Sequence, residues 1–127
     1  MATVVDEKLA VYKGIQEDIQ KLFTQKQQTL SQFNENTLVK GELDMLEDSG
    51  KVFKLVGPVL MAVELQESRA NVGKRLEFIE AEIKKVDNNI AVKQGEAASL
   101  GDEIALAQKA MQMEAAKAAQ AIAAGAA

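Results

Sequence analysis

The segment KVFKLVGPVLMAVE, residues 51 to 64, is rich in β-branched and other apolar residues, whereas the sequence on either side of it favours helix. Its two apolar runs are separated by Gly57-Pro58, which includes the only proline of the chain. Short apolar runs that flank a glycine-containing turn signal predict a β-hairpin. The polar, glycine-ended residues 47 to 50 (EDSG) are typical of a helix end, and Ser68 is a suitable N-cap for a second helix.

Both faces of this expected hairpin are apolar. Alternation along the first strand places Phe53 and Leu55 on one face and Val52 and Val56 on the other. A two-stranded hairpin is marginally stable in water, and its two edges are free to pair with further strands. We therefore expect the hairpin to be an assembly element that hairpins from other chains complete. The alternative is a hairpin that folds back onto its own helix ends.

The sequences before and after the hairpin both carry apolar residues at alternating spacings of four and three, the heptad pattern of a coiled coil. The heptad positions are Val5, Leu9, Tyr12, Gln16, Ile19, Phe23, Lys26, Leu30, Phe33 and Thr37 before the hairpin, and Val72, Leu76, Ile79, Ile83, Val86, Ile90, Lys93, Ala97, Leu100, Ile104, Ala107 and Met111 after it. We expect a mainly α fold, in which a long antiparallel two-helix coiled coil carries the β-hairpin at its connecting end.

One domain, residues 1 to 127, is expected to hold all of these elements. Its expected boundaries are a helix at about 5–47, the hairpin at about 51–64, a helix at about 68–113 and an alanine-rich tail at about 114–127. The tail has almost no large apolar residue to anchor it, so fraying or disorder is expected there.

The register of the helix pair follows if the chain folds symmetrically near residue 60. Phe33 then lies level with Val86, Leu30 with Ile90, Phe23 with Ala97, and Leu9 with Met111. In the same register Lys26 and Lys93 share a layer. The two lysines either extend their ammonium groups to water or form a weak layer where the helix pair can bend.

The composition excludes most enzyme chemistry. The sequence has no cysteine and no histidine, which excludes disulfides, the common zinc sites and the Cys-His or Ser-His nucleophile pairs. We expect no catalytic residue, no cofactor and no metal. An enzyme that uses only carboxylates and lysines is a remote alternative, because the densest acidic group, Glu42, Asp44, Glu47 and Asp48, is better interpreted as a solvated helix end.

Charge and hydropathy narrow the possible partners. The formal net charge is -4, whereas phosphate binding requires clustered lysines and arginines, so no nucleic-acid partner is expected. The longest mainly apolar run, Leu55 to Val63, is about half of the roughly 20 residues that a membrane helix requires. Because Met1 to Val5 is followed at once by charged residues, no secretory signal is expected, and we expect the chain to be cytoplasmic.

Residues 35 to 85, ENTLVKGELDMLEDSGKVFKLVGPVLMAVELQESRANVGKRLEFIEAEIKK, resemble the β class of the prefoldin family. The motifs that carry the resemblance are KLVGPVL, residues 54 to 60, and ANVGKRLEFIEAEIK, residues 70 to 84. Family members often have Val-Lys-Gln where residues 61 to 63 of this chain are Met-Ala-Val, so its second strand is more apolar than the family pattern. The connector has room for one hairpin, as in the β class, whereas α-class subunits have two.

The resemblance implies an ATP-independent co-chaperone. In this family two α-class and four β-class subunits join their hairpins into a β-barrel platform, which makes a hetero-hexamer. Six coiled coils extend from the platform, and their free ends hold unfolded client proteins, chiefly actin and tubulin. The clients are passed to the cytosolic group II chaperonin. No reaction is catalysed, no cofactor is required, and neither nucleic acid nor membrane is a partner.

The resemblance also implies two sets of functional residues. Subunit assembly is expected to use Val52, Phe53, Leu55, Val56, Gly57, Pro58, Val59, Leu60, Met61 and Val63, with the glycine and the proline shaping the turn. The client-binding tip is expected to contain Val4, Val5, Leu9, Tyr12, Leu106, Met111 and Met113. Methionine suits a surface with many clients, because its flexible thioether adapts to different shapes. The alternative for the tip residues is that they close the last layers of an ordinary coiled coil.

Two other functions stay open. A structural coiled-coil tether or scaffold would use both helices, but it has no need of an apolar hairpin. A prefoldin relative that assembles into filaments from one kind of chain would keep the chaperone function.

Overall fold

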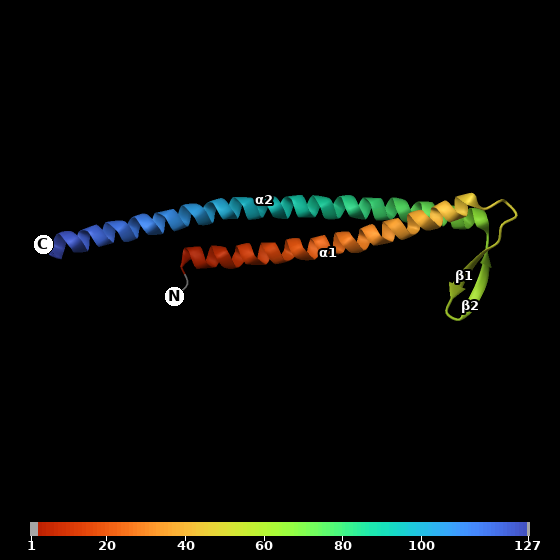
Figure 1. The fold of residues 1–127 in the computed structure, drawn as a ribbon, viewed down its shortest axis with the longest axis horizontal. Coiled ribbons are helices and arrows are strands. Elements are labelled where there is room, and N and C mark those ends of the chain that lie inside the picture. Colours follow the sequence, from red (N-terminus) through yellow and green to blue (C-terminus); the bar gives the residue numbers. More distant parts are fainter. Residues whose placement is uncertain (1–2, 127) are drawn as a thin grey trace. The chain divides into compact units, whose positions relative to one another are not determined.

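The chain forms two long helices with a two-stranded hairpin between them, as Figure 1 shows for the computed structural model, which describes residues 3 to 126. The elements in chain order are α1 (Val4–Met45), β1 (Val52–Val56), β2 (Val59–Val63) and α2 (Leu65–Ala126). The expected fold class, mainly α with a β-hairpin between two long helices, is confirmed. No helical segment among the described residues has an apolar run sufficient to cross a bilayer.

The helix ends differ from the expected boundaries. α1 ends at Met45, and α2 begins at Leu65, three residues before Ser68. The Ser68 amide donates a hydrogen bond of 3.0 Å to the Glu64 carbonyl, so Ser68 already lies within the first turn and cannot be the N-cap. The alanine-rich stretch, expected to fray or to be disordered, is instead helical as far as Ala126, because alanine has a high helix propensity.

The hairpin has the two-residue turn that its sequence predicts. β1 and β2 pair antiparallel, with Val52 opposite Val63 at the base and Val56 opposite Val59 beside the turn. Gly57 has a φ of +58°, which a residue with a Cβ rarely adopts. A glycine with positive φ at the first central position is typical of a type II′ turn, and the fixed φ of Pro58 suits the second position.

Contacts group the described residues into two compact units. Residues 23 to 88 form the first, which we call the hairpin unit, because it contains β1 and β2 with the helix segments next to them. Residues 3 to 22 together with 89 to 126 form the second, which we call the end unit, because it contains the first and the last described residues.

The core of the hairpin unit lies where the helices meet the hairpin. Leu43 of α1 packs with Leu65 and Val72 of α2, and Val52 and Leu76 pack against this cluster. Ile79 and Val86 continue the buried stripe of α2, and Val86 is only 2% exposed. The segments of α1 and α2 are antiparallel, and the Lys26 ammonium lies 2.7 Å from an Asp87 carboxylate oxygen.

In the end unit the heptad stripe of α2 continues through Ile90, Ala97 and Ile104, which are all buried. Ion pairs join the two helix segments here, between Lys8 and Glu103 at 3.1 Å and between Lys93 and Asp18 at 3.6 Å. These ion pairs show that the segments of α1 and α2 are antiparallel in the end unit too.

The register expected from symmetric folding near residue 60 is wrong by about one heptad. Lys26 lies beside Asp87, and Lys93 beside Asp18, so the two lysines do not share a layer and each has a carboxylate partner. The physical reason is the connector. A loop from residue 46 to 51 precedes β1, whereas Glu64 alone links β2 to α2. The symmetry point of the helix pair therefore lies at about residue 56, before the hairpin turn, rather than at residue 60.

The buried stripe of α1 agrees only in part with the expected heptad positions. Val5 and Ile19 are buried, but Leu9 and Phe23 are 42% and 40% exposed, and Leu22 is half-buried in place of Phe23. A single partner helix covers a narrow strip of α1, so the flank of a broad apolar stripe stays in contact with water.

Cysteine pairs test the register, because the chain has no cysteine of its own. From the Lys26–Asp87 pair, Leu30 lies level with Ile83, so L30C/I83C is expected to form a disulfide on mild oxidation. Ile90 lies one heptad, about 10 Å, farther along α2, beyond the roughly 7 Å Cα separation that a disulfide spans. Equal crosslinking of L30C/I83C and L30C/I90C on a non-reducing gel would contradict this register.

Candidate functional site

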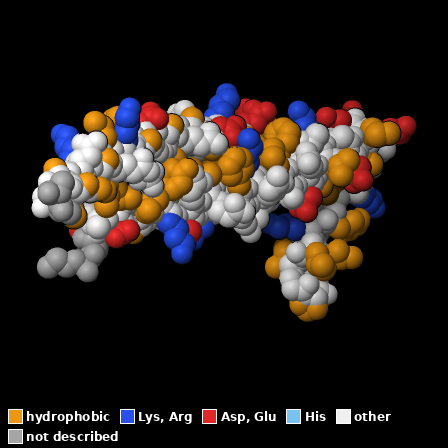
Figure 2. Space-filling view, turned by 60° about the vertical axis from the view of Figure 1, so that its left-hand side comes forward, with side chains coloured by type: hydrophobic (Ala, Val, Ile, Leu, Met, Phe, Trp, Pro, Cys, Tyr) orange, Lys and Arg blue, Asp and Glu red, His pale blue; other side chains and the backbone are white. Residues whose placement is uncertain are grey.

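The hairpin leaves most of its large apolar side chains exposed. Leu55 and Leu60, a cross-strand pair, are 68% and 65% exposed, although both are large and apolar. Figure 2 shows hydrophobic side chains at the tip and along the edges of the hairpin. The exposed residues of the two strands are Phe53, Lys54, Leu55, Val56, Val59, Leu60, Met61 and Ala62.

The register divides these side chains between two faces. The pairs Phe53–Ala62 and Leu55–Leu60 share one face. The pairs Val52–Val63, Lys54–Met61 and Val56–Val59 share the other. Both faces therefore present apolar side chains, and only Val52 and Val63, at the base, are half-buried.

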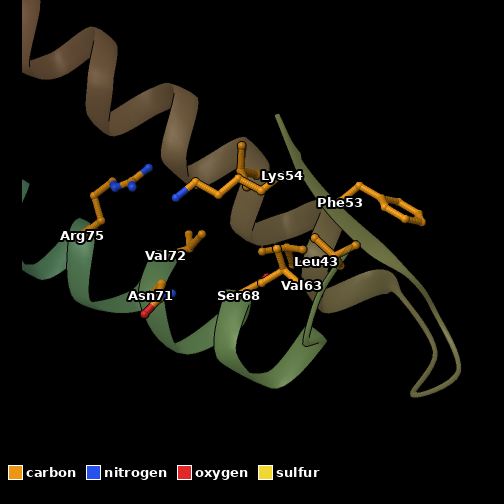
Figure 3. Close-up of a pocket in the computed structure, with 10 residues that line it drawn as sticks. Leu43, Phe53, Lys54, Val63, Ser68, Asn71, Val72 and Arg75 are labelled. Carbon is orange, nitrogen blue, oxygen red and sulfur yellow. The ribbon is translucent and has the colours of Figure 1, made fainter. Parts of the chain in front are cut away.

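The base of the hairpin forms a groove with the helices, shown in Figure 3. The groove has a volume of about 230 Å³, and we call it the basal groove. Its lining residues are Val39, Leu43, Val52, Phe53, Lys54, Val63, Ser68, Asn71, Val72 and Arg75. In the close-up the Phe53 ring points away from the helices, whereas the Lys54 side chain extends toward Arg75 of α2.

Arg69 attaches the end of α1 to the beginning of α2. Its guanidinium donates two hydrogen bonds, of 3.1 and 2.9 Å, to the Leu43 carbonyl and one of 2.8 Å to the Leu46 carbonyl. Leu43 lies in the last turn of α1, where its carbonyl also accepts a hydrogen bond of 3.3 Å from the Leu46 amide, and Leu46 directly follows the helix. Arg69 adds donors at this helix end, where backbone donors are few. Arg69 thus fixes the helix ends from which the hairpin extends.

Sequence reasoning did not identify Arg69. One signal was available, because a positive charge close to the beginning of a helix is opposed by the helix dipole. An arginine at that position is therefore expected to have an acceptor elsewhere, and the carbonyl end of a neighbouring antiparallel helix is one such acceptor.

The structure divides the expected tip residues into groups. Val5 is buried, and Tyr12 is half-buried with its ring next to Gly101, so these two residues close layers of the helix pair. Val4, Leu9 and Leu106 are exposed on the same paired segment.

Met111 and Met113 do not lie beside the N-terminal residues, contrary to the expected register that placed Leu9 level with Met111. Because Lys8 pairs with Glu103, the beginning of α1 lies level with α2 residues before Met111. Every residue of α2 from 111 to 125 is exposed. The last turns of α2 are therefore a single helix with an apolar surface that includes both methionines and Ile122.

The remaining polar groups form no ligand cluster. Within residues 3 to 126 no group of three or more carboxylate-type ligands could hold a metal ion. Glu42, Asp44, Glu47 and Asp48 are all exposed near the end of α1, where solvent surrounds them. The arrangement of the described residues offers apolar surfaces for binding.

Comparison with known proteins gives consistent matches over nearly the whole chain. Residues 6 to 118 match the family model described as "Prefoldin subunit". "Probable prefoldin subunit 6" of Caenorhabditis briggsae is 39% identical over 115 residues, which are 91% of this chain and 90% of the nematode protein. "Prefoldin subunit 6" of Mus musculus is 44% identical over 94 residues, which are 71% of this chain and 74% of the mouse protein.

The fold has a counterpart among solved structures. The crystal structure of the prefoldin beta subunit from Thermococcus strain KS-1 matches with a TM-score of 0.76, over 84% of this chain and 96% of that chain. The two sequences are 20% identical, so this likeness concerns the fold alone.

Arg69→Ala is expected to lower the free energy of unfolding by about 1 to 3 kcal/mol, because it removes charge-assisted donors from carbonyls at the end of α1. Arg69→Lys keeps the charge but loses the planar fork, so an intermediate loss is expected. Urea unfolding followed by circular dichroism measures both. Arg75→Ala, at an exposed position six residues farther along the same helix, is the matched control, and an equal effect of the two alanine variants would contradict the role of Arg69.

Proposed function

The chain belongs to the prefoldin family, whose members are chaperone subunits that assemble with one another, and from this premise we propose that it is a β-class subunit of a hetero-hexamer. In this proposal two α-class and four β-class subunits join their hairpins, and the complex captures unfolded proteins without ATP. Its clients include actin and tubulin, and it delivers them to the cytosolic group II chaperonin. The chain acts in the cytoplasm as a binding component and catalyses no reaction.

The observation that carries this proposal is the uncovered hairpin. Both of its faces are apolar, and its own helices half-bury only the base pair Val52–Val63. Full burial of one large aliphatic or aromatic side chain stabilises a protein by about 1.5 to 3 kcal/mol relative to exposure. Strands from neighbouring subunits would cover both faces and pair with both free edges, which removes the cost of leaving them in water.

Client binding is proposed for the end unit. The single-helix end of α2 presents Met111, Met113 and Ile122, which are 48%, 56% and 73% exposed. Flexible thioethers on a helix without a partner can adapt to unfolded chains of many sequences. Val4, Leu9 and Leu106 extend this surface onto the paired segment, whereas the burial of Val5 and Tyr12 favours a structural role for these two.

Phe53→Asp is expected to prevent assembly, because a carboxylate would have to be buried between hairpins. The measurement is the particle mass by light scattering after mixing with an α-class prefoldin subunit. A discrete particle of about six chains is expected for the unchanged protein, as the family resemblance implies. Phe78→Asp is the matched control, since Phe78 is also exposed, at 66%, but lies on α2. A monomer or simple dimer in every mixture would favour a coiled-coil tether instead.

The triple substitution Met111→Gln, Met113→Gln and Ile122→Gln is expected to weaken suppression of actin aggregation several-fold while the particle mass is unchanged. Glutamine keeps helix propensity and removes the apolar surface. Turbidity of actin diluted from denaturant, in the presence of the assembled complex, measures the effect. Alanine-to-glutamine changes at 110, 115 and 118 are the control, and unchanged suppression by the triple variant would show that the end of α2 does not bind clients.

A further inference from the structure

The basal groove combines an apolar floor with two cationic side chains. Leu43 and Val72 lie at its floor and belong to the core of the hairpin unit. Lys54 enters from β1 and Arg75 from α2, so the two charges come from elements on different sides of the groove. No lining residue of the groove is acidic.

Neither cation has a carboxylate partner within the described part of the chain. The ion pairs of the helices involve Lys8, Lys26 and Lys93, and each of these lysines lies beside an aspartate or a glutamate. Lys54, by contrast, extends toward Arg75, which carries the same charge. Like charges that face one groove repel each other, and the repulsion is stronger next to an apolar floor than in open water.

A carboxylate in the groove would remove this repulsion. An arginine fork and a lysine ammonium can bind the two oxygens of one carboxylate through short, charge-assisted hydrogen bonds. The Ser68 hydroxyl and the Asn71 amide, which also line the groove, are further donors. The apolar floor would cover the aliphatic part of the same incoming side chain.

We propose that the basal groove binds an acidic side chain from the hairpin region of the neighbouring prefoldin subunit, with Lys54 and Arg75 as its partners. This inference rests on the proposed function, since it names a contact within the assembly. The groove is continuous with the assembly surface, because Phe53 and Val63 belong both to its lining and to the strands. Its volume of about 230 Å³ accommodates a few side chains rather than a helix.

The other side of the hairpin base carries carboxylates instead of a pair of cations. A second hollow, of about 480 Å³, is lined there by Asp48 and Glu64 together with Phe53 and Ala62. One side of the base is therefore cationic, whereas the other side carries two carboxylates and the single amine of Lys51. A subunit with two unlike sides accepts its neighbours in one order, so the Lys54–Arg75 contact would help to fix the order in the ring.

Carbodiimide crosslinking of the assembled complex tests the contact directly, because this reagent joins an amine to a carboxylate that touches it. Mass spectrometry is expected to find Lys54 joined to an aspartate or a glutamate of the neighbouring subunit's hairpin region. Lys54→Arg keeps the charge but cannot form the amide, so it should lose the crosslink and still assemble. A Lys54 that stays unmodified, or is joined only to its own chain, would overturn the proposal.

Charge reversal gives a second test. The pair Lys54→Glu and Arg75→Glu is expected to weaken association with an α-class subunit by about 10- to 100-fold. The pair Lys84→Glu and Lys85→Glu makes the same change in net charge at exposed positions outside the groove, and an effect below about twofold is expected. Equal effects of the two pairs would overturn the groove contact.

Phe53→Asp and the charge reversal together separate this inference from the proposed function. If Phe53→Asp prevents assembly while the Lys54 and Arg75 reversal does not weaken it, the hairpin assembles without the groove contact, and the inference alone is wrong. If Phe53→Asp also leaves assembly intact, the hairpin is no assembly element, and the proposed function and the inference are both wrong.

Discussion

The structure depends on one constraint, which is that the hairpin cannot bury its apolar side chains within its own chain. A strand has two faces, and the helix ends reach only the base of one of them, where Val52 packs against Leu43 and Val72. Beyond the base, the pair Leu55–Leu60 faces water. A two-stranded hairpin is marginally stable in water by itself, and in the proposed assembly strands of neighbouring subunits would cover it.

The features around the hairpin are consistent with this constraint. Arg69 joins the ends of the two helices, so the hairpin extends from a firm support. The buried stripe of α2 continues this support from Leu65 to Val86. The end unit differs, because α2 continues as a single exposed helix after residue 110. In the proposed function, the firm base would support specific assembly, and the adaptable apolar end would bind clients of many sequences.

Much of the fold could be predicted from the sequence, because heptad spacing and the Gly57-Pro58 turn are local signals. The register could not, since it depends on how the loop at 46–51 and the single residue Glu64 divide the connector between the two helix ends. The wrong register placed Met111 level with Leu9, and it therefore predicted that the two helices pair with each other at the client-binding tip. The register also decides which residues lie close together around Arg69 and in the basal groove. The spacing of residues along the sequence does not predict these contacts.

Hydrogen exchange at the hairpin amides measures the central claim most directly. In the isolated chain we expect the amides of β1 and β2 to exchange quickly, while those around Val72 and Val86 exchange slowly. On assembly with an α-class subunit, the strand amides should become protected by orders of magnitude, and the core amides should change little. Strong protection of both strands in a monomeric chain would contradict the claim, because it would show that the hairpin is complete without a partner.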